Sequence, residues 1–120
     1  MQKQILILED DKINQELIKF YLNNQYKIKI VSSVTEAIHE VSSSNYDLVI
    51  SDLILGADPK TNGLTFLKQL KSDSKYKHIP VVSYSAHTDP DLIKDFDANI
   101  SKPISKIDFM KRIESILEKN

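Results

Sequence analysis

The sequence contains no cysteine among its 120 residues, so it offers neither a disulfide nor a thiolate nucleophile. It also lacks an apolar run long enough to cross a membrane, and Met1–Gln4 lead directly into a strand-like segment rather than an export signal. Its net charge of -1 gives no general attraction to nucleic acid or to an anionic membrane surface. We therefore expect a soluble cytoplasmic protein that binds neither.

A chain of 120 residues is long enough for one domain with its own hydrophobic core. Short apolar or β-rich segments predict five strands, and apolar residues at helical spacing follow each of them. No linker, repeat or low-complexity tract interrupts this alternation. The predicted strands are Ile5–Leu8, Tyr26–Val31, Leu48–Ser51, Ile79–Tyr84 and Ala98–Ser101.

Several polar residues have the spacing of helix N-caps. Ser33 lies three residues before Glu36, and Ser105 lies three residues before Asp108. Asp89 precedes Pro90, which predicts the start of a short fourth helix. The apolar residues expected on the inner faces of the first two helices are Ile13, Leu17, Phe20, Tyr21, Val34, Ala37, Ile38 and Val41.

This alternation of strands and helices predicts an α/β fold. The expected form is a doubly wound parallel sheet of five strands, with helices on both faces and right-handed crossovers. In such sheets, ligands bind outside the carboxyl ends of the strands, where the strand order reverses. The residues at those ends are therefore the first candidates for a functional site.

Acidic residues follow two of the predicted strands directly. Glu9 and Asp10 come after the first strand, and Asp52 comes after the third. Carboxylates held this close repel one another unless a divalent cation lies among them, and Mg²⁺ prefers such oxygen ligands together with phosphate oxygens and water. The sequence therefore predicts a Mg²⁺ site that serves phosphoryl chemistry. Asp11 is expected to be a helix N-cap instead.

Two further polar residues complete the set, since Ser85 follows the fourth predicted strand and Lys102-Pro103 follows the fifth. Taken in order with the acidic residues, this set resembles the receiver domain of two-component response regulators over the whole chain, residues 1–120. The resemblance implies a single domain with the flavodoxin-like (βα)5 fold and the strand order 2-1-3-4-5.

The resemblance also implies a role for each residue at the strand ends. Asp52 would be the phosphoacceptor, since a carboxylate beside Mg²⁺ can attack a phosphoryl group. Glu9 and Asp10 would hold the metal with Asp52, and the backbone carbonyl of Ile54 would be a further ligand.

Lys102 and the Ser85 hydroxyl would contact the phosphoryl oxygens. The phosphoryl donor would be a histidine kinase or a histidine phosphotransfer protein, and the signal would pass to a downstream protein target. We expect the chain to catalyse only its own phosphorylation and dephosphorylation.

The sequence departs from the family pattern at three places. Asn99 stands three residues before Lys102, where receivers commonly carry Tyr or Phe. Lys102 follows Ser85 by 17 residues, fewer than is usual, and Gly63 follows Asp52 by 11 residues, more than is common. The region of the fourth helix is therefore expected to be short, and residues 58–62 are expected to form a longer loop.

Three other interpretations stay open, of which the departures favour the first. The chain could be a receiver-like binding module that works without phosphorylation, or a receiver excised from a hybrid histidine kinase. A small Mg²⁺-dependent phosphatase is a third class, but the apolar residues Leu53-Ile54-Leu55 after Asp52 offer no general acid. The sequence leaves the oligomeric state open.

Overall fold

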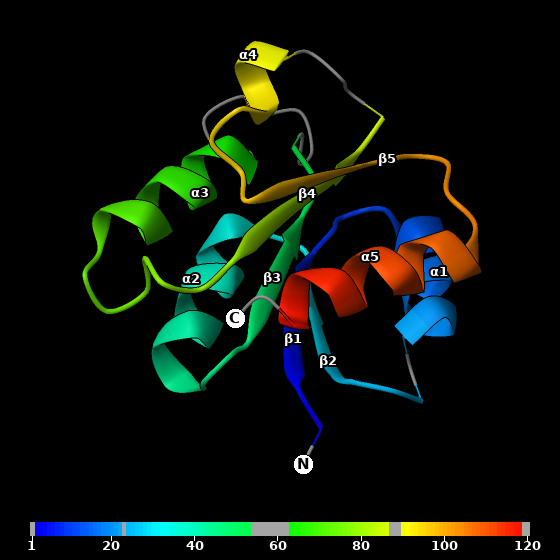
Figure 1. The fold of residues 1–120 in the computed structure, drawn as a ribbon. Helices are drawn as coiled ribbons and strands as arrows, with labels where there is room; N and C mark the ends of the chain where they lie inside the picture. The colour runs from blue at the N-terminus through cyan, green and yellow to red at the C-terminus, as the bar shows by residue number, and fades with distance from the viewer. Residues whose placement is uncertain (1, 23, 54–62, 87–89, 119–120) are drawn as a thin grey trace.

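The structure is a computed structural model that describes residues 2–22, 24–53, 63–86 and 90–118. Its centre is one parallel sheet with the strand order β2-β1-β3-β4-β5, as the resemblance implied (Figure 1). The strands are β1 (Gln4–Leu8), β2 (Lys27–Val31), β3 (Leu48–Ser51), β4 (Val81–Ser85) and β5 (Ala98–Ser101).

Helices cover both faces of the sheet, so the predicted doubly wound α/β fold is confirmed. Helices α1 (Lys12–Leu22) and α5 (Lys106–Glu118) lie on one face, while α2 (Val34–Ser43) and α3 (Gly63–Ser72) lie on the other (Figure 1). The fourth helix, α4 (Pro90–Ile93), is a single turn, in agreement with the short helix predicted there. None of the described helices is both long and apolar enough to cross a membrane.

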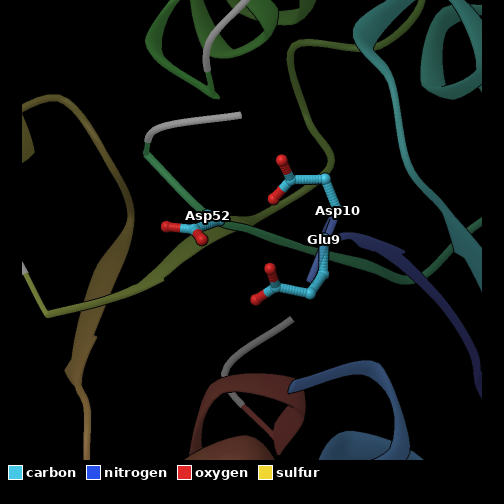
Figure 2. A group of neighbouring side chains, drawn as sticks. All are labelled: Glu9, Asp10 and Asp52. Atoms are coloured by element: carbon cyan, nitrogen blue, oxygen red, sulfur yellow. The ribbon is translucent and has the colours of Figure 1, made fainter. Parts of the chain in front are cut away.

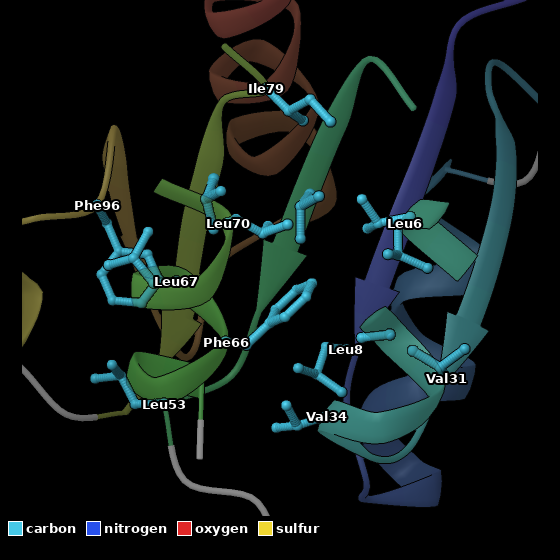
Figure 3. Packing of buried hydrophobic residues seen from close by; sticks show 14 residues of the cluster. Leu6, Leu8, Val31, Val34, Leu53, Phe66, Leu67, Leu70, Ile79 and Phe96 are labelled. Atoms are coloured by element: carbon cyan, nitrogen blue, oxygen red, sulfur yellow. The ribbon is translucent and has the colours of Figure 1, made fainter. Parts of the chain in front are cut away.

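The central strands are apolar on both sides because helices cover both faces of the sheet. All four residues of Leu48–Ser51 are buried, as are Ile5–Leu8 in the neighbouring strand. Alternate residues of β1 therefore enter different cores: Leu6 and Leu8 pack with Phe66 of α3 (Figure 3), and Ile5 and Ile7 pack on the opposite face. Such continuous apolar runs are typical of parallel sheets.

Two strands begin later in the structure than the sequence predicted. β2 begins at Lys27 rather than Tyr26, and β4 begins at Val81 rather than Ile79. Pro80 explains the second difference because it has no backbone N–H to donate to a neighbouring strand. Its carbonyl still accepts a hydrogen bond from the amide of Val49 at 3.0 Å.

The predicted inner face of α1 is partly wrong. Ile13 and Phe20 are 78% and 66% exposed, whereas Ile18, Tyr21 and Leu22 are buried. Two apolar stripes compete in this helix. Residues 18, 21 and 22 form one stripe with i, i+3, i+4 spacing. Ile13 and Phe20, seven positions apart, lie on nearly the same side of the helix and form the other. Spacing alone did not show which of the two stripes faces the sheet. Ile38 of α2 is also more exposed than predicted, at 39%.

The helix starts follow the capping pattern of the sequence. The Ser33 hydroxyl accepts a hydrogen bond from the amide of Glu36 at 3.1 Å, and the Ser105 hydroxyl accepts one from the amide of Asp108 at 3.1 Å. The Asp11 carboxylate accepts one from the amide of Asn14 at 2.9 Å, which confirms its predicted N-cap role. The predicted cap at Asp89 and the loop at residues 58–62 lie outside the described residues.

Candidate functional site

The pairing of β1 with β3 brings the acidic residues together. Leu8 is the register partner of Ser51, so Glu9 and Asp52 are the next residues along two adjacent parallel strands. Their backbones are fixed by hydrogen bonds to the sheet: the amide of Asp52 donates to the carbonyl of Leu8 at 3.0 Å, and the amide of Glu9 donates to that of Val31 at 3.0 Å. The sheet therefore sets the position of both carboxylates before any ligand binds.

Three carboxylates form a cluster at this edge of the sheet (Figure 2). Glu9, Asp10 and Asp52 each present one oxygen, and the three oxygens lie within 4.8 Å of one another. Carboxylate oxygens are hard ligands of the kind that Mg²⁺ prefers. The three side chains predicted as metal ligands thus fit a divalent cation in type and in spacing. The fourth predicted ligand, the backbone carbonyl of Ile54, lies outside the described residues.

The ammonium of Lys102 lies between two of these carboxylates. Its Nζ is 3.0 Å from Oε1 of Glu9 and 3.4 Å from Oδ2 of Asp52. All three side chains are largely shielded from water, since Lys102 is 15% exposed, Asp52 14% and Glu9 1%. Because water screens the attraction poorly here, Lys102 neutralises the cluster more effectively than a surface lysine could.

Glu9 is the most deeply buried of the three carboxylates in the cluster. Burial raises its pKa above the ordinary value of 4.5, and the bonds from Lys102 and from the amide of Asp11 oppose this rise without cancelling it. The Asp11 amide donates to Oε2 of Glu9 at 3.2 Å, and the side-chain amide of Gln15 donates to the Glu9 carbonyl at 2.6 Å. Sequence reasoning missed Gln15, because a glutamine inside a helix carries no motif of its own.

Asp52 is held by groups of its own loop. The amide of Leu53 donates to Oδ1 at 2.7 Å, which leaves Oδ2 on the side of Lys102. Gly63, the first residue of α3, donates its amide to the Leu53 carbonyl at 2.9 Å. A Cβ placed on Gly63 would collide with the Asp52 carbonyl oxygen and lie 2.6 Å from the Ser51 hydroxyl oxygen. In the sequence, Gly63 stood out only by its distance from Asp52, yet its missing side chain allows α3 to approach Asp52.

Ser85 and Lys102 occupy the ends of β4 and β5, the positions that the sequence predicted. Ser85 is buried at 3% exposure, and its carbonyl accepts a hydrogen bond from the amide of Lys102 at 3.0 Å. The Lys102-Pro103 peptide bond is cis. The tips of β4 and β5 are thereby tied to each other beside the acidic cluster.

Asn99 makes polar contacts at the position where an aromatic ring was expected from the resemblance. Its side-chain carbonyl accepts a hydrogen bond from the hydroxyl of Ser83 at 2.6 Å, across the register pair of β4 and β5. Its backbone carbonyl accepts one from the Arg112 guanidinium of α5 at 3.0 Å. A bonded path therefore runs from β4, two residues before Ser85, to the surface of α5.

Comparison with known proteins decides the family. A family model described as the response regulator receiver domain matches residues 5–117. The chain belongs to this family. This receiver is 32% identical to the polar-differentiation response regulator DivK of Brucella ovis, and the match covers 98% of each chain.

Solved structures similar to this receiver share its fold. The response regulator receiver domain (CheY-like) of Methylobacillus flagellatus is 31% identical with a TM-score of 0.81, and the match covers 97% of this chain and 99% of that one. The phosphorylated cyanobacterial phytochrome response regulator RcpA is 28% identical with a TM-score of 0.79, and the match covers 98% of this chain and 93% of that one.

The contact at Gly63 predicts the effect of adding one methyl group. Alanine in a helix is normally more stable than glycine, by about 1 kcal/mol. Here the methyl would displace the backbone of Asp52, so we expect Gly63→Ala to lower the free energy of unfolding by about 1–3 kcal/mol, measured by urea denaturation. A variant as stable as the wild type would show that α3 does not rest on Asp52. Ser72→Ala, at the exposed end of α3, is the control.

The burial of Glu9 predicts a pH dependence of stability in the absence of divalent cations. The pKa of the Glu9 carboxyl is higher in the folded protein than in the unfolded chain, so the folded protein binds the carboxyl proton more tightly. This tighter binding stabilises the fold at low pH. The stabilisation is lost as the pH rises from 4.5 through the folded pKa. We therefore expect the free energy of unfolding of the wild type, relative to Glu9→Gln, to fall between pH 4.5 and 7.

The measurement is urea denaturation in EDTA at several pH values. Glu16→Gln is the control, since the Glu16 side chain is 73% exposed and lies on the outer surface of α1. A difference between wild type and Glu9→Gln that stays constant, or that grows with pH, would contradict the assignment.

Proposed function

We propose that this receiver takes a phosphoryl group from a phosphohistidine onto Asp52, with Mg²⁺, and signals through changed protein contacts. The observation that carries the proposal is the cluster of three carboxylate oxygens within 4.8 Å, with the Lys102 ammonium 3.4 Å from Asp52. The donor would be a histidine kinase or a histidine phosphotransfer protein of the same cytoplasm. The chain would turn over no external substrate and would catalyse only the gain and loss of its own phosphoryl group.

The reaction is a single displacement at phosphorus. Oδ2 of Asp52, the oxygen that faces Lys102, would attack the phosphorus atom. A P–O bond forms, the P–N bond of the phosphohistidine breaks, and its electron pair returns to the imidazole nitrogen, so the product is an acyl phosphate. The other oxygen, Oδ1, accepts a hydrogen bond from the amide of Leu53 and would not take part in the displacement.

Glu9, Asp10 and Asp52 are the residues that would hold Mg²⁺. When bound, the cation supplies positive charge to the phosphoryl oxygens and lowers their repulsion with the carboxylates. Lys102 would donate to a phosphoryl oxygen, and the Ser85 hydroxyl at the tip of β4 would donate to another. Lys102 needs only a short movement, because its ammonium already lies beside Asp52.

An exposed apolar surface next to the cluster supports docking of a protein donor. Ile13 and Phe20 of α1 and Ile107 of α5 are 78%, 66% and 67% exposed. The Lys106 ammonium lies 4.5 Å from the centre of the Phe20 ring, so the two helices contribute to one surface. Because α1 begins directly after the acidic residues, a donor packed here would bring its histidine to Asp52.

The path through Asn99 indicates how the signal would leave the site. A phosphoryl group on Asp52 would draw in Ser85 and shift the tip of β4. Ser83 lies on the same side of that strand, so its bond to Asn99, and the bond of Asn99 to Arg112, would respond. The same contacts favour a second candidate, a module that binds its partner without phosphorylation, because a bonded Ser83–Asn99 pair can also fix one state.

The test is the intact mass of the protein after incubation with acetyl phosphate, with and without Mg²⁺. We expect one phosphoryl group that depends on Mg²⁺, is lost in hydroxylamine, and is absent from Asp52→Ala but present on Asp95→Ala, a change of an exposed aspartate. An adduct that persists in Asp52→Ala would overturn the choice of phosphoacceptor. The absence of any adduct, with Mg²⁺ binding intact, would favour the second candidate.

A further inference from the structure

Lys102 has a third neighbour besides the two carboxylates. Its Nζ lies 4.9 Å from the centre of the Tyr84 ring. A cation within about 6 Å of a ring centre is attracted to the face of the ring, and the attraction grows when water is excluded. The 4.9 Å distance meets the first condition. Water is also largely excluded, because the Lys102 side chain is 15% exposed and Tyr84 is 2% exposed.

The Tyr84 ring is itself fixed by a row of aromatic side chains. Its centre lies 5.2 Å from that of Phe109 in an edge-to-face arrangement, and Phe109 lies 5.3 Å from Tyr21. The Tyr21 hydroxyl donates to the carbonyl of Ile104 at 2.7 Å, two residues beyond Lys102. The ring under the ammonium and the backbone that carries Lys102 are therefore anchored to the same aromatic cluster.

Binding of a divalent cation would change the surroundings of Lys102. Glu9 and Asp52 hold the ammonium now, and both belong to the carboxylate cluster that fits a cation. A metal ion bound there would compete for both carboxylates and repel the ammonium. Of these three contacts of Lys102, only the one with the Tyr84 ring involves an uncharged group. A metal ion at the carboxylates does not compete for that ring.

We propose that Tyr84 is a positioning residue for phosphoryl transfer: its ring holds the Lys102 ammonium over the site while the carboxylates are occupied. This inference rests on the proposed function. Without the ring, Lys102 would turn toward water when the metal ion enters and would reach the phosphoryl oxygen less often. Burial, with Tyr21, Glu9 and Asp52 nearby, raises the pKa of Tyr84 to about 12, so the ring stays neutral near neutral pH and does not trap Lys102 as a phenolate.

The test compares variants of the ring by the rate of adduct formation from acetyl phosphate at saturating Mg²⁺. We expect Tyr84→Leu to be slower by about tenfold, the size of a shielded cation–ring contact, and Tyr84→Phe to restore most of the rate. Val82→Ala is the control for packing, since Val82 is buried on the same side of β4 as Tyr84 but pairs with Ala98, four residues before Lys102. It should lose stability and keep its rate.

A double-mutant cycle with Lys102→Met separates positioning from structure. If Tyr84 acts through the ammonium, Tyr84→Leu should lower the rate of adduct formation when Lys102 is present and leave the rate unchanged when Lys102 is replaced by Met. Equal slowing in both backgrounds would overturn the proposal, as would a Tyr84→Phe variant as slow as Tyr84→Leu. If the wild type forms no adduct at all, the proposed function fails and this inference fails with it.

A series of fluorinated phenylalanines at position 84 covers the case in which Tyr84→Leu does not fold. Each fluorine withdraws charge from the ring face and changes the size of the side chain little. A rate that falls with each added fluorine supports the proposal, and a rate that stays constant across the series contradicts it.

Discussion

The ammonium of Lys102, placed between Glu9 and Asp52, is the interaction on which the site depends. The cluster offers three carboxylate oxygens within 4.8 Å, a concentration of negative charge that positive charge beside it stabilises. Lys102 supplies that charge, since its Nζ lies 3.0 Å from Oε1 of Glu9 and 3.4 Å from Oδ2 of Asp52. Under the proposed function, a cation and a phosphoryl group would take over contacts that Lys102 and the carboxylates already make with one another.

The fold supports this arrangement by fixing each group on a different strand. Adjacent strands β1 and β3 hold Glu9 and Asp52, and β4 and β5 hold Ser85 and Lys102. Because backbone hydrogen bonds within the sheet fix the main chain at these positions, the residues that carry the charged groups cannot move apart without breaking strand pairing. Contacts from the helices complete the site: α3 approaches Asp52 through Gly63, and Phe109 of α5 packs on the Tyr84 ring that lies beside Lys102.

Much of this arrangement could be predicted from the sequence because strand ends carry a clear signal. Apolar runs followed at once by Glu9 or Asp52 locate both the strands and the edge where the acids meet. The inner face of α1 was not predictable in the same way, since Ile13 and Phe20 repeat at helical spacing as regularly as the residues that are buried. The contacts of Gly63, Gln15 and Tyr84 also could not be predicted, because each depends on a neighbour distant in the chain or on backbone geometry that no local motif records.

If Lys102 and a divalent cation compensate the same carboxylates, removing the ammonium should change how strongly Mg²⁺ raises the melting temperature. The melting temperatures of the wild type and of Lys102→Met would be recorded in EDTA and in a series of Mg²⁺ concentrations. Removing the ammonium leaves Glu9 and Asp52 uncompensated, so the variant should melt lower in EDTA and gain more from Mg²⁺ than the wild type. An equal gain in both proteins would show that Mg²⁺ binds without sensing the charge of Lys102, and shared compensation of the carboxylates would then be wrong.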